Sequence, residues 1–575
     1  MEIHQETYDT VPGYDVPRGQ LAAGYAALAE QLLFADAPIW LIDGMSGVDW
    51  PALHSGLQTA LGHRSVEWID VAVARKETAA IKQLLAPYLD NRDQVFGKLY
   101  DGNLIEFFDE QGLEQLRERM QQAVARGQQV ICFGQGSALL NIDRRVAWID
   151  LPKEIITQQV SSGRNILLGT PSYPGMKSIY WVDWPVMERH KTSLLGKLDL
   201  FVDLTEPVQP VFASGDDVRT ALQVLAHQPF RVKPVFYPGA WGGQWMKQHM
   251  QLDPAQPNYA WSYELITPEN GIVLCDGELR LEIPFEMLMA QETINIQGQP
   301  VADRFGASFP IRFNYDDTLE GGNLSCQVHP QLQYARQEFG LTYAQDETYY
   351  ILRAGQGGLC YLGLKQGIDP QAFRRAAEGA RDEGVGFDTE GFVNAWPTRV
   401  HDLFLIPAGT VHNSGANNVV LEISATPYLY TFKIYDYLRR DLKGNLRPIH
   451  IERAWENIDF NRQTHWVRQN LIPSPRIIRT GPGWTEYVIG THPLMFFAIH
   501  RAEFARSYPD DTQHQRFHVL NLVEGDQISI EWAGGRHPLR YAETIVIPAA
   551  VGHYTLHHDS AGVAKVVKAF VRDLD

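Results

Sequence analysis

The sequence pattern changes once, near residue 230, and this change most constrains the fold. Before it, short apolar runs alternate with amphipathic segments whose apolar residues recur at helical spacing. One such segment covers residues 113–127, with Leu116, Met120 and Ala123 on one face. The apolar runs that we expect to be buried strands span residues 37–45, 66–74, 128–134, 145–151 and 198–204. This alternation predicts an α/β domain with a mainly parallel, doubly wound sheet over residues 1–230.

After residue 230, glycine and proline become frequent and short alternating runs dominate, for example residues 279–286, 404–412 and 418–425. Many short strands with turn signals between them predict a sandwich or barrel. The phrases "LFLIPAGTVHNS" and "TIVIPAAVGHYT" both place a His five residues after an Ile-Pro pair. This internal repeat predicts two related β-barrels, at 231–470 and 471–575. A helical insertion is expected at 369–381 in the first barrel.

Composition excludes several classes of function. The formal charge of −18 disfavours nucleic acid as a partner, because binding phosphates needs clustered Lys and Arg. No basic segment leads into an apolar one at the start, and no stretch approaches a membrane span, so we expect a cytoplasmic protein without a signal peptide. The four cysteines are scattered and never in CxxC spacing, so any metal must use His, carboxylate or amide ligands.

A glycine-containing turn, "DGMSGVDW", follows the first predicted strand, where a nucleotide-binding loop would lie. It lacks the Lys and the Ser or Thr of GxxxxGK[ST], which hold phosphate and Mg²⁺. The first block resembles a P-loop kinase of the uridine-kinase type whose loop has lost its chemistry. We therefore expect a degenerate P-loop-like domain with a structural or regulatory role, and residual nucleotide binding is the alternative.

Candidate metal ligands gather in the second block. Gln327 and His329 are two residues apart on a predicted strand, so both project to the same face. Glu347 opens the aromatic strand "ETYYIL", and His412 ends "PAGTVH". Such donors suit Zn²⁺ or another divalent first-row ion. Strand placement alone also allows each His to be a satisfied interior or turn histidine.

The wording of these segments resembles type I mannose-6-phosphate isomerases of the short bacterial kind, members of the cupin superfamily. The matching phrases include "LSCQVHP", "DETYYIL", "PAGTVH", "AWGGQWM", "TFKIYDYLRRD" and "RPIHIERAWENID". The resemblance covers about residues 235–575. It implies a metal bound by Gln327, His329, Glu347 and His412, whereas the C-terminal barrel has no counterpart of these motifs and is expected to be metal-free.

Two positions depart from the family's pattern. Gln345 stands where such enzymes commonly carry a Lys associated with the substrate phosphate, and Lys433 replaces the family's active-site arginine. Lys433 keeps the positive charge of that arginine but lacks the guanidinium that binds two oxygens at once. Lys433, Arg439 and Glu264 are the candidate catalytic residues, and His249 is a further candidate for substrate contact.

The resemblance implies a metal-dependent aldose-ketose isomerase that acts on a sugar phosphate or a related sugar. The alternative from another class is a non-catalytic carbohydrate-sensing or regulatory cupin protein, which the changes at Gln345 and Lys433 favour. Non-haem iron chemistry is a third possibility, against which the fourth ligand Gln327 argues because it leaves fewer open positions. The partner is a small-molecule sugar or sugar phosphate in either of the first two cases. The oligomeric state and the exact sugar stay open.

Overall fold

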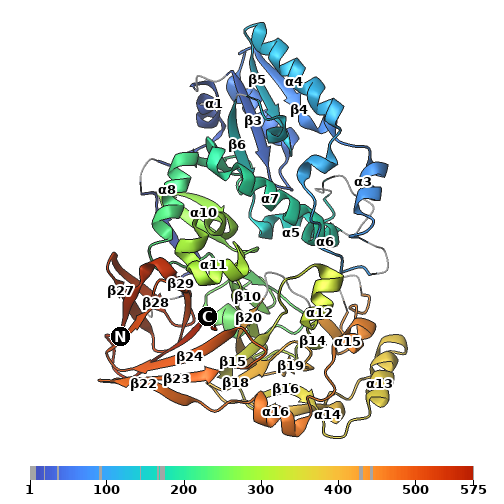
Figure 1. Ribbon diagram of the computed structural model, residues 1–575, viewed down its shortest axis with the longest axis vertical. Helices are drawn as coiled ribbons and strands as arrows, with labels where there is room; N and C mark the ends of the chain where they lie inside the picture. Colours follow the sequence, from blue (N-terminus) through green and yellow to red (C-terminus); the bar gives the residue numbers. More distant parts are fainter. Residues whose placement is uncertain are drawn as a thin grey trace.

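A computed structural model describes residues 8–573, except 18–19, 35–37, 90–92, 143, 165–167, 169–174, 426–430 and 441–443. The opening residues 1–7, which entered the expectation of no signal peptide, lie outside the described part. Figure 1 shows an α/β part at the top and a larger strand-rich part below it. In the described residues, no helix is both long and apolar enough to cross a membrane.

The α/β part is built on a seven-stranded sheet of order β2-β8-β7-β6-β3-β5-β4. Five neighbouring strands are parallel, as predicted. They are β3 (Ile39–Gly44), β4 (Val66–Asp70), β5 (Gln129–Phe133), β6 (Arg145–Asp150) and β7 (Leu200–Asp203). The edge strands β8 (Val211–Ser214) and β2 (Ala22–Ala23) run antiparallel to their neighbours. The chain passes from β3 to β4 and β5 on one side of β3 and then crosses to β6 and β7 on the other side, which gives the doubly wound order.

Local chemistry shifts two of the predicted boundaries in this part. The run 66–74 is a strand only to Asp70, because the Asp70 side chain accepts a hydrogen bond from Ala72 N and starts a 3₁₀ turn. Helix α4 (Glu110–Ala125) begins three residues before the predicted start, where the Asp109 carboxylate caps Gly112 N. Its buried residues include Leu116, Met120 and Ala123, as the pattern predicted.

The middle of the chain folds as two facing sheets. One has the order β18-β15-β20-β13-β10-β9 and the other β17-β16-β19-β14-β21. The first sheet comprises β9 (Val235–Tyr237), β10 (Trp261–Leu265), β13 (Ile311–Asp317), β15 (Glu347–Ala354), β18 (Leu403–Ile406) and β20 (Asn418–Ala425). The second comprises β14 (Cys326–Val328), β16 (Leu359–Leu364), β17 (Val393–Pro397), β19 (His412–Ser414) and β21 (Phe432–Tyr435). The predicted helical insertion is α13 (Pro370–Asp382), capped by Asp369.

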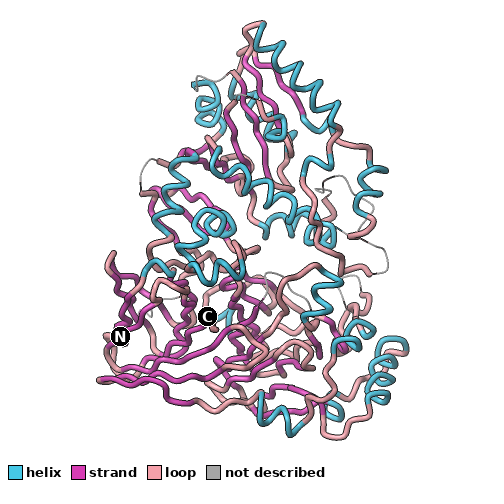
Figure 2. Tube along the Cα trace, in the orientation of Figure 1, coloured by secondary structure: helices cyan, strands magenta, loops and turns pink. Residues whose placement is uncertain are grey.

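Other helices of this part were not predicted. The run 279–286 is a strand only as far as β12 (Leu279–Pro284), which pairs with β11 (Gly271–Asp276). Helix α10 (Phe285–Gln297) starts directly after Pro284 and is followed by α11 (Gln299–Phe305). Apolar residues lie on every face of α10, so the helix has no clear amphipathic pattern. The alternating residues at the start of the run 279–286 predicted a strand instead. Figure 2 shows these helices between the α/β sheet and the strand-rich part.

The C-terminal part contains two further sheets of order β22-β23-β24-β31-β26-β29 and β25-β30-β27-β28. The main strands are β23 (Trp484–Gly490), β24 (Phe497–Phe504), β26 (His518–Glu524), β27 (Gln527–Trp532), β30 (His553–His557) and β31 (Ala564–Val571). Remaining strands are β22 (Arg476–Gly481), β25 (Ser507–Asp511), β28 (Gly535–Arg540) and β29 (Thr544–Ile547). The two sheets enclose a separate core that includes Phe504, Leu522 and Ile545.

The first described residues do not join the α/β sheet. Strand β1 (Gly13–Asp15) pairs in parallel with β11 of the middle part. Tyr8 donates hydrogen bonds to the Glu264 carboxylate at 2.7 and 2.8 Å, and Asp9 N donates to Glu543 at 2.8 Å. This segment therefore links the middle and C-terminal parts, although its position in the sequence suggested membership of the first block. The proposed division at residues 230 and 470 stays a prediction.

Candidate metal centre

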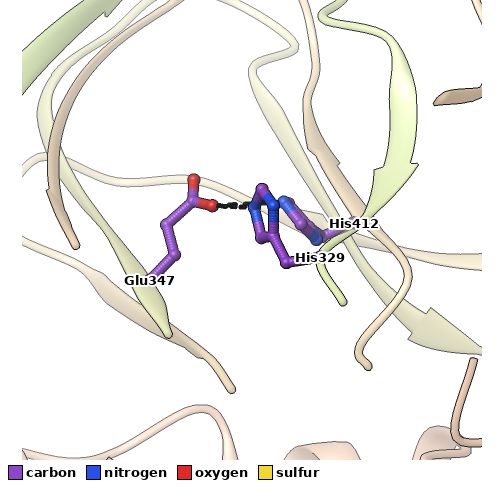
Figure 3. Close-up of side chains that lie close together, drawn as sticks. All are labelled: His329, Glu347 and His412. Atoms are coloured by element: carbon purple, nitrogen blue, oxygen red, sulfur yellow. Dashed lines mark hydrogen bonds and ion pairs between the residues drawn. The ribbon is translucent and has the colours of Figure 1, made fainter. Parts of the chain in front are cut away.

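Three side chains from different strands converge between the two sheets of the middle part. His329 directly follows β14, Glu347 opens β15 and His412 opens β19. Each is at most 1% exposed, and one ligand atom from each lies within 4.8 Å of the others. His329 Nε2 contacts Glu347 Oε2, and His412 Nε2 lies 3.5 Å from the same oxygen. Figure 3 shows both imidazoles turned toward the carboxylate.

The orientation of His412 is fixed by its own loop. Its Nδ1 donates to the carbonyl of Thr410 at 2.8 Å, which turns Nε2 toward Glu347. Such a bond selects the tautomer that ligates a metal through Nε2. The loop is held in turn by Arg462, whose Nη1 donates to the carbonyls of Pro407 and Ala408 at 2.6 and 2.8 Å. The "PAGTVH" phrase thus folds into a rigid support for one ligand.

Gln327 lies beside the three residues. Its main chain pairs directly with His412, and its side-chain amide nitrogen lies 3.3 Å from His412 Nε2. Rotation of the amide by 180° exchanges its nitrogen and oxygen with little change of shape. The oxygen can therefore face the same point as the histidines. The structure brings together all four residues named from the sequence, and their role as ligands stays a proposal.

The donors present fit a divalent metal ion. Glu347 Oε1 is buried and has no hydrogen-bond partner among the described residues, which is costly unless another group or an ion satisfies it. Burial alone would raise the pKa of Glu347, but His329 and His412 hold that pKa well below its usual range. An ionised carboxylate and two imidazoles form a donor set that suits Zn²⁺ and related ions. The cluster can bind a metal, and the donor set does not decide which one.

A group of cations lies beside this centre. Lys433 on β21 pairs in register with Gln327 on β14, and directly paired residues project to the same face. The Asp436 carboxylate forms ion pairs with three cations: Lys433 Nζ at 3.7 Å, Arg439 Nη1 at 3.3 Å and Arg447 Nη1 at 3.0 Å. Burial, followed by the charge of Arg447, lowers the pKa of Lys433 to about 8. Arg439, Arg447 and Asp436 also line a cavity of about 220 Å³.

Two other candidates from the sequence lie elsewhere. Glu264 on β10 accepts hydrogen bonds from Tyr8 and Ser262, and burial raises its pKa to about 7. Its other charged neighbours are Arg231 and Glu543, so the contacts of Glu264 link the first described residues to the middle and C-terminal parts. His249 stacks on Trp245, with ring centroids 4.7 Å apart, and contacts the ring of Tyr541 in the C-terminal part.

The sequence reasoning missed a polar network behind Glu347. Glu422 accepts hydrogen bonds from Arg312 and Asn314 at 2.8 and 3.0 Å. Burial and the neighbouring Glu422 raise the pKa of Asp316 well above its usual range. A signal was present, because polar residues occupy every second position in "IRFNYDD" and in "LEIS". In a strand this alternation indicates a polar interior.

Comparisons with known proteins divide the chain in a similar way. A family model described as a domain of unknown function (DUF8485) matches residues 24–227. The mannose-6-phosphate isomerase of Streptococcus mutans is 23% identical over 336 residues, which cover 58% of this chain and 96% of the relative. Mannose-6-phosphate isomerase ManA of Bacillus subtilis is also 23% identical, over 339 residues. A crystal structure of the Bacillus subtilis enzyme superposes with a TM-score of 0.47 and 18% identity, covering 59% of this chain and 99% of that one.

These relatives match nearly their whole length against little more than half of this chain. The remainder, about two fifths of the chain, lies outside the matches. The chain is therefore a relative of the mannose-6-phosphate isomerases and carries additional residues that these relatives do not have.

Proposed function

We propose that the protein is a metal-dependent isomerase that interconverts the aldose and ketose forms of a sugar phosphate. The observation that carries this proposal is the convergence of His329, Glu347 and His412, with Gln327 beside them, in one buried cluster. The relatives named mannose-6-phosphate isomerase support the same reaction class. Mannose 6-phosphate is accordingly the first substrate to test.

The cation group gives the substrate's anionic part a place to bind. Lys433, Arg439 and Arg447 bring three positive charges to one carboxylate, Asp436, so about two charges are left without a partner of opposite sign in this group. Their side chains are 15–20% exposed, so water screens them only in part. A phosphate oxygen facing Arg439 and Arg447, which line the cavity, would gain charge-assisted hydrogen bonds and would leave Lys433 for the reacting end of the sugar. This supports a phosphorylated sugar over a neutral one.

The reaction moves a proton between C1 and C2 of the sugar, and negative charge develops on the two oxygens as it moves. A bound metal ion would supply Lewis-acid stabilisation of that charge. Lys433 projects to the same face as Gln327 and would stabilise an oxyanion as a point charge. Because the pKa of Lys433 is lowered to about 8, a fraction of this residue is neutral near neutral pH and can accept a proton. His329, Glu347 and His412 would hold the metal in position.

The test combines metal analysis with activity on a panel of phosphorylated and free sugars that includes mannose 6-phosphate. We expect one divalent ion per chain and isomerisation of at least one sugar phosphate. His329→Ala should lose both. Tight sugar binding without turnover by metal-loaded wild-type protein would instead support the carbohydrate-sensing alternative.

For the α/β part we propose a degenerate P-loop-like domain that does not use nucleotide. The Asp43 carboxylate, at the end of β3, accepts hydrogen bonds from Gly136 N and Ala138 N at 2.9 and 3.0 Å and contacts His190 Nε2 at 2.8 Å. A buried carboxylate thus already accepts hydrogen bonds from two main-chain N–H groups at the end of β3. Its negative charge would also repel a phosphate. Titration calorimetry with Mg-ATP tests this proposal, and micromolar affinity would overturn it.

A further inference from the structure

A short segment of the α/β part covers the outer edge of the strand that carries Lys433. In the second sheet of the middle part, β21 is the last strand in the order, so one of its edges has no strand neighbour. Residues 93–96, which follow α3 (Thr78–Leu85) in the chain, pack against this side of the molecule. An uncovered edge strand leaves its main-chain N–H and C=O groups without protein partners, and native proteins often cover such an edge with a helix or loop. The covering segment therefore bears on how firmly Lys433 is held.

Phe96 provides the main contact. It is 5% exposed, and its ring lies edge-on to Phe432 at 5.1 Å and to His450 at 4.9 Å between centroids. The guanidinium of Arg453 lies 5.6 Å above the same ring. A buried Phe of this kind removes about 150–250 Å² from water. Phe432 is the residue directly before Lys433.

His450 connects this contact to Lys433 itself. Its main-chain N–H donates to the Lys433 carbonyl at 2.7 Å, and Lys433 N–H donates to His450 Nδ1 at 3.4 Å. Together these two bonds satisfy both main-chain groups of Lys433 on the edge that lacks a strand. His450 stands at the start of α15 (Ile451–Asn457), whose first turn carries Arg453. A displacement of α15 would break these two hydrogen bonds between His450 and Lys433.

Asp93 fixes α15 against the α/β part. Its carboxylate accepts a hydrogen bond from Arg453 Nε at 2.9 Å, and it also caps the turn by accepting from Val95 N and Phe96 N at 2.8 and 3.0 Å. The same carboxylate therefore shapes the segment that presents Phe96 and binds the helix that Phe96 contacts. The hydrogen bond from Arg453 and the ring contacts of Phe96 with Phe432 and His450 cross between the α/β part and the middle part.

We propose that Phe96 and Asp93 are positioning residues for Lys433, so that the α/β part completes the framework of the active site. This inference rests on the proposed isomerase function, but its structural part does not. Both residues act on Lys433 through His450, Phe432 and Arg453.

The experiment compares Phe96→Ala with Phe201→Ala in the full-length protein. Phe201 is fully buried in β7 of the same α/β part, in a different sheet from β21, so it controls for general destabilisation. We expect Phe96→Ala to lower kcat on mannose 6-phosphate by about 10-fold or more with KM within about twofold, since small misplacements of catalytic groups cost up to about 10² in rate. Phe201→Ala should keep the wild-type kcat. Phe96→Leu should keep most of the wild-type kcat.

A second measurement is independent of activity. Hydrogen exchange of the main-chain amides in residues 432–435 should be about 10-fold faster in Phe96→Ala and unchanged in Phe201→Ala. If wild type isomerises nothing but the exchange result holds, the proposed function fails and the positioning role stands. Equal exchange in Phe96→Ala and wild type would overturn the positioning role. Equal loss of kcat in the Phe96→Ala and Phe201→Ala variants would overturn it as well.

Discussion

Replacing Glu347 by Gln tests the metal centre most directly, because the change keeps the size of the side chain and removes its charge. Metal binding by a folded site of four donors releases about 10–16 kcal/mol. An equal share for each of the four donors is about 3 kcal/mol, which corresponds to about 10²-fold in affinity. Glu347 is the one charged donor among the four, so about 10²-fold is a lower bound on the loss of metal affinity. We expect Glu347→Gln to bind the metal at least about 10²-fold more weakly.

The assay is competition against a chelator of known affinity, followed by elemental analysis of the protein. Glu422→Gln is the matched control, since Glu422 is also a buried glutamate on the interior face, paired through β20 with Tyr349, two residues after Glu347. The control should keep its metal affinity within a few fold. Wild-type metal occupancy in Glu347→Gln at limiting metal would refute the ligand assignment.

Three further predictions follow from the same residues. Lys433→Ala should lower kcat about 10²-fold with little change in KM, as expected for a contact made mainly in the transition state, whereas an equal rise in KM would point to ground-state binding. Lys433→Arg combined with Gln345→Lys should raise the rate on mannose 6-phosphate, and kinetics on that sugar decide it. Burial raises the pKa of Glu264 to about 7 from 4.5, so its contribution to stability is complete below pH 4.5 and is lost as the pH rises through 7. Thermal unfolding of Glu264→Gln should therefore lack this decline, worth up to about 3 kcal/mol, and should keep wild-type isomerase activity.

Much of the proposed metal cluster was predictable, because the residues proposed as ligands lie on or next to short strands where spacing determines the face. Gln327 and His329 share a face by their period of two, and "PAGTVH" ends on the residue that opens β19. What the sequence could not show is the support behind them. Arg462, for example, is fifty residues from His412 and reaches the loop only through the packing of α16 (Thr464–Asn470) and its neighbours.

Glu264 shows why an acidic residue in a strand is a weak indicator of catalysis. Alternation puts each strand residue on one of two faces, and the sequence does not say which face meets the site. In β10, the face of Glu264 meets Tyr8, Arg231 and the region of Glu543. Tyr8 is 256 residues away in the chain, so no local pattern could have indicated it.

The same reasoning explains why the role of the α/β part had to come from the structure. Phe96 and His450 are more than three hundred residues apart, and Phe96 sits in a segment without helical or strand periodicity, where an aromatic residue is normally read as local packing. Its significance lies in where β21 falls in the sheet order, at the edge. Because an edge strand needs a cover and this one carries Lys433, the segment that supplies the cover becomes part of the catalytic framework. An additional domain can thus affect an isomerase without contacting its substrate, by holding one strand in place.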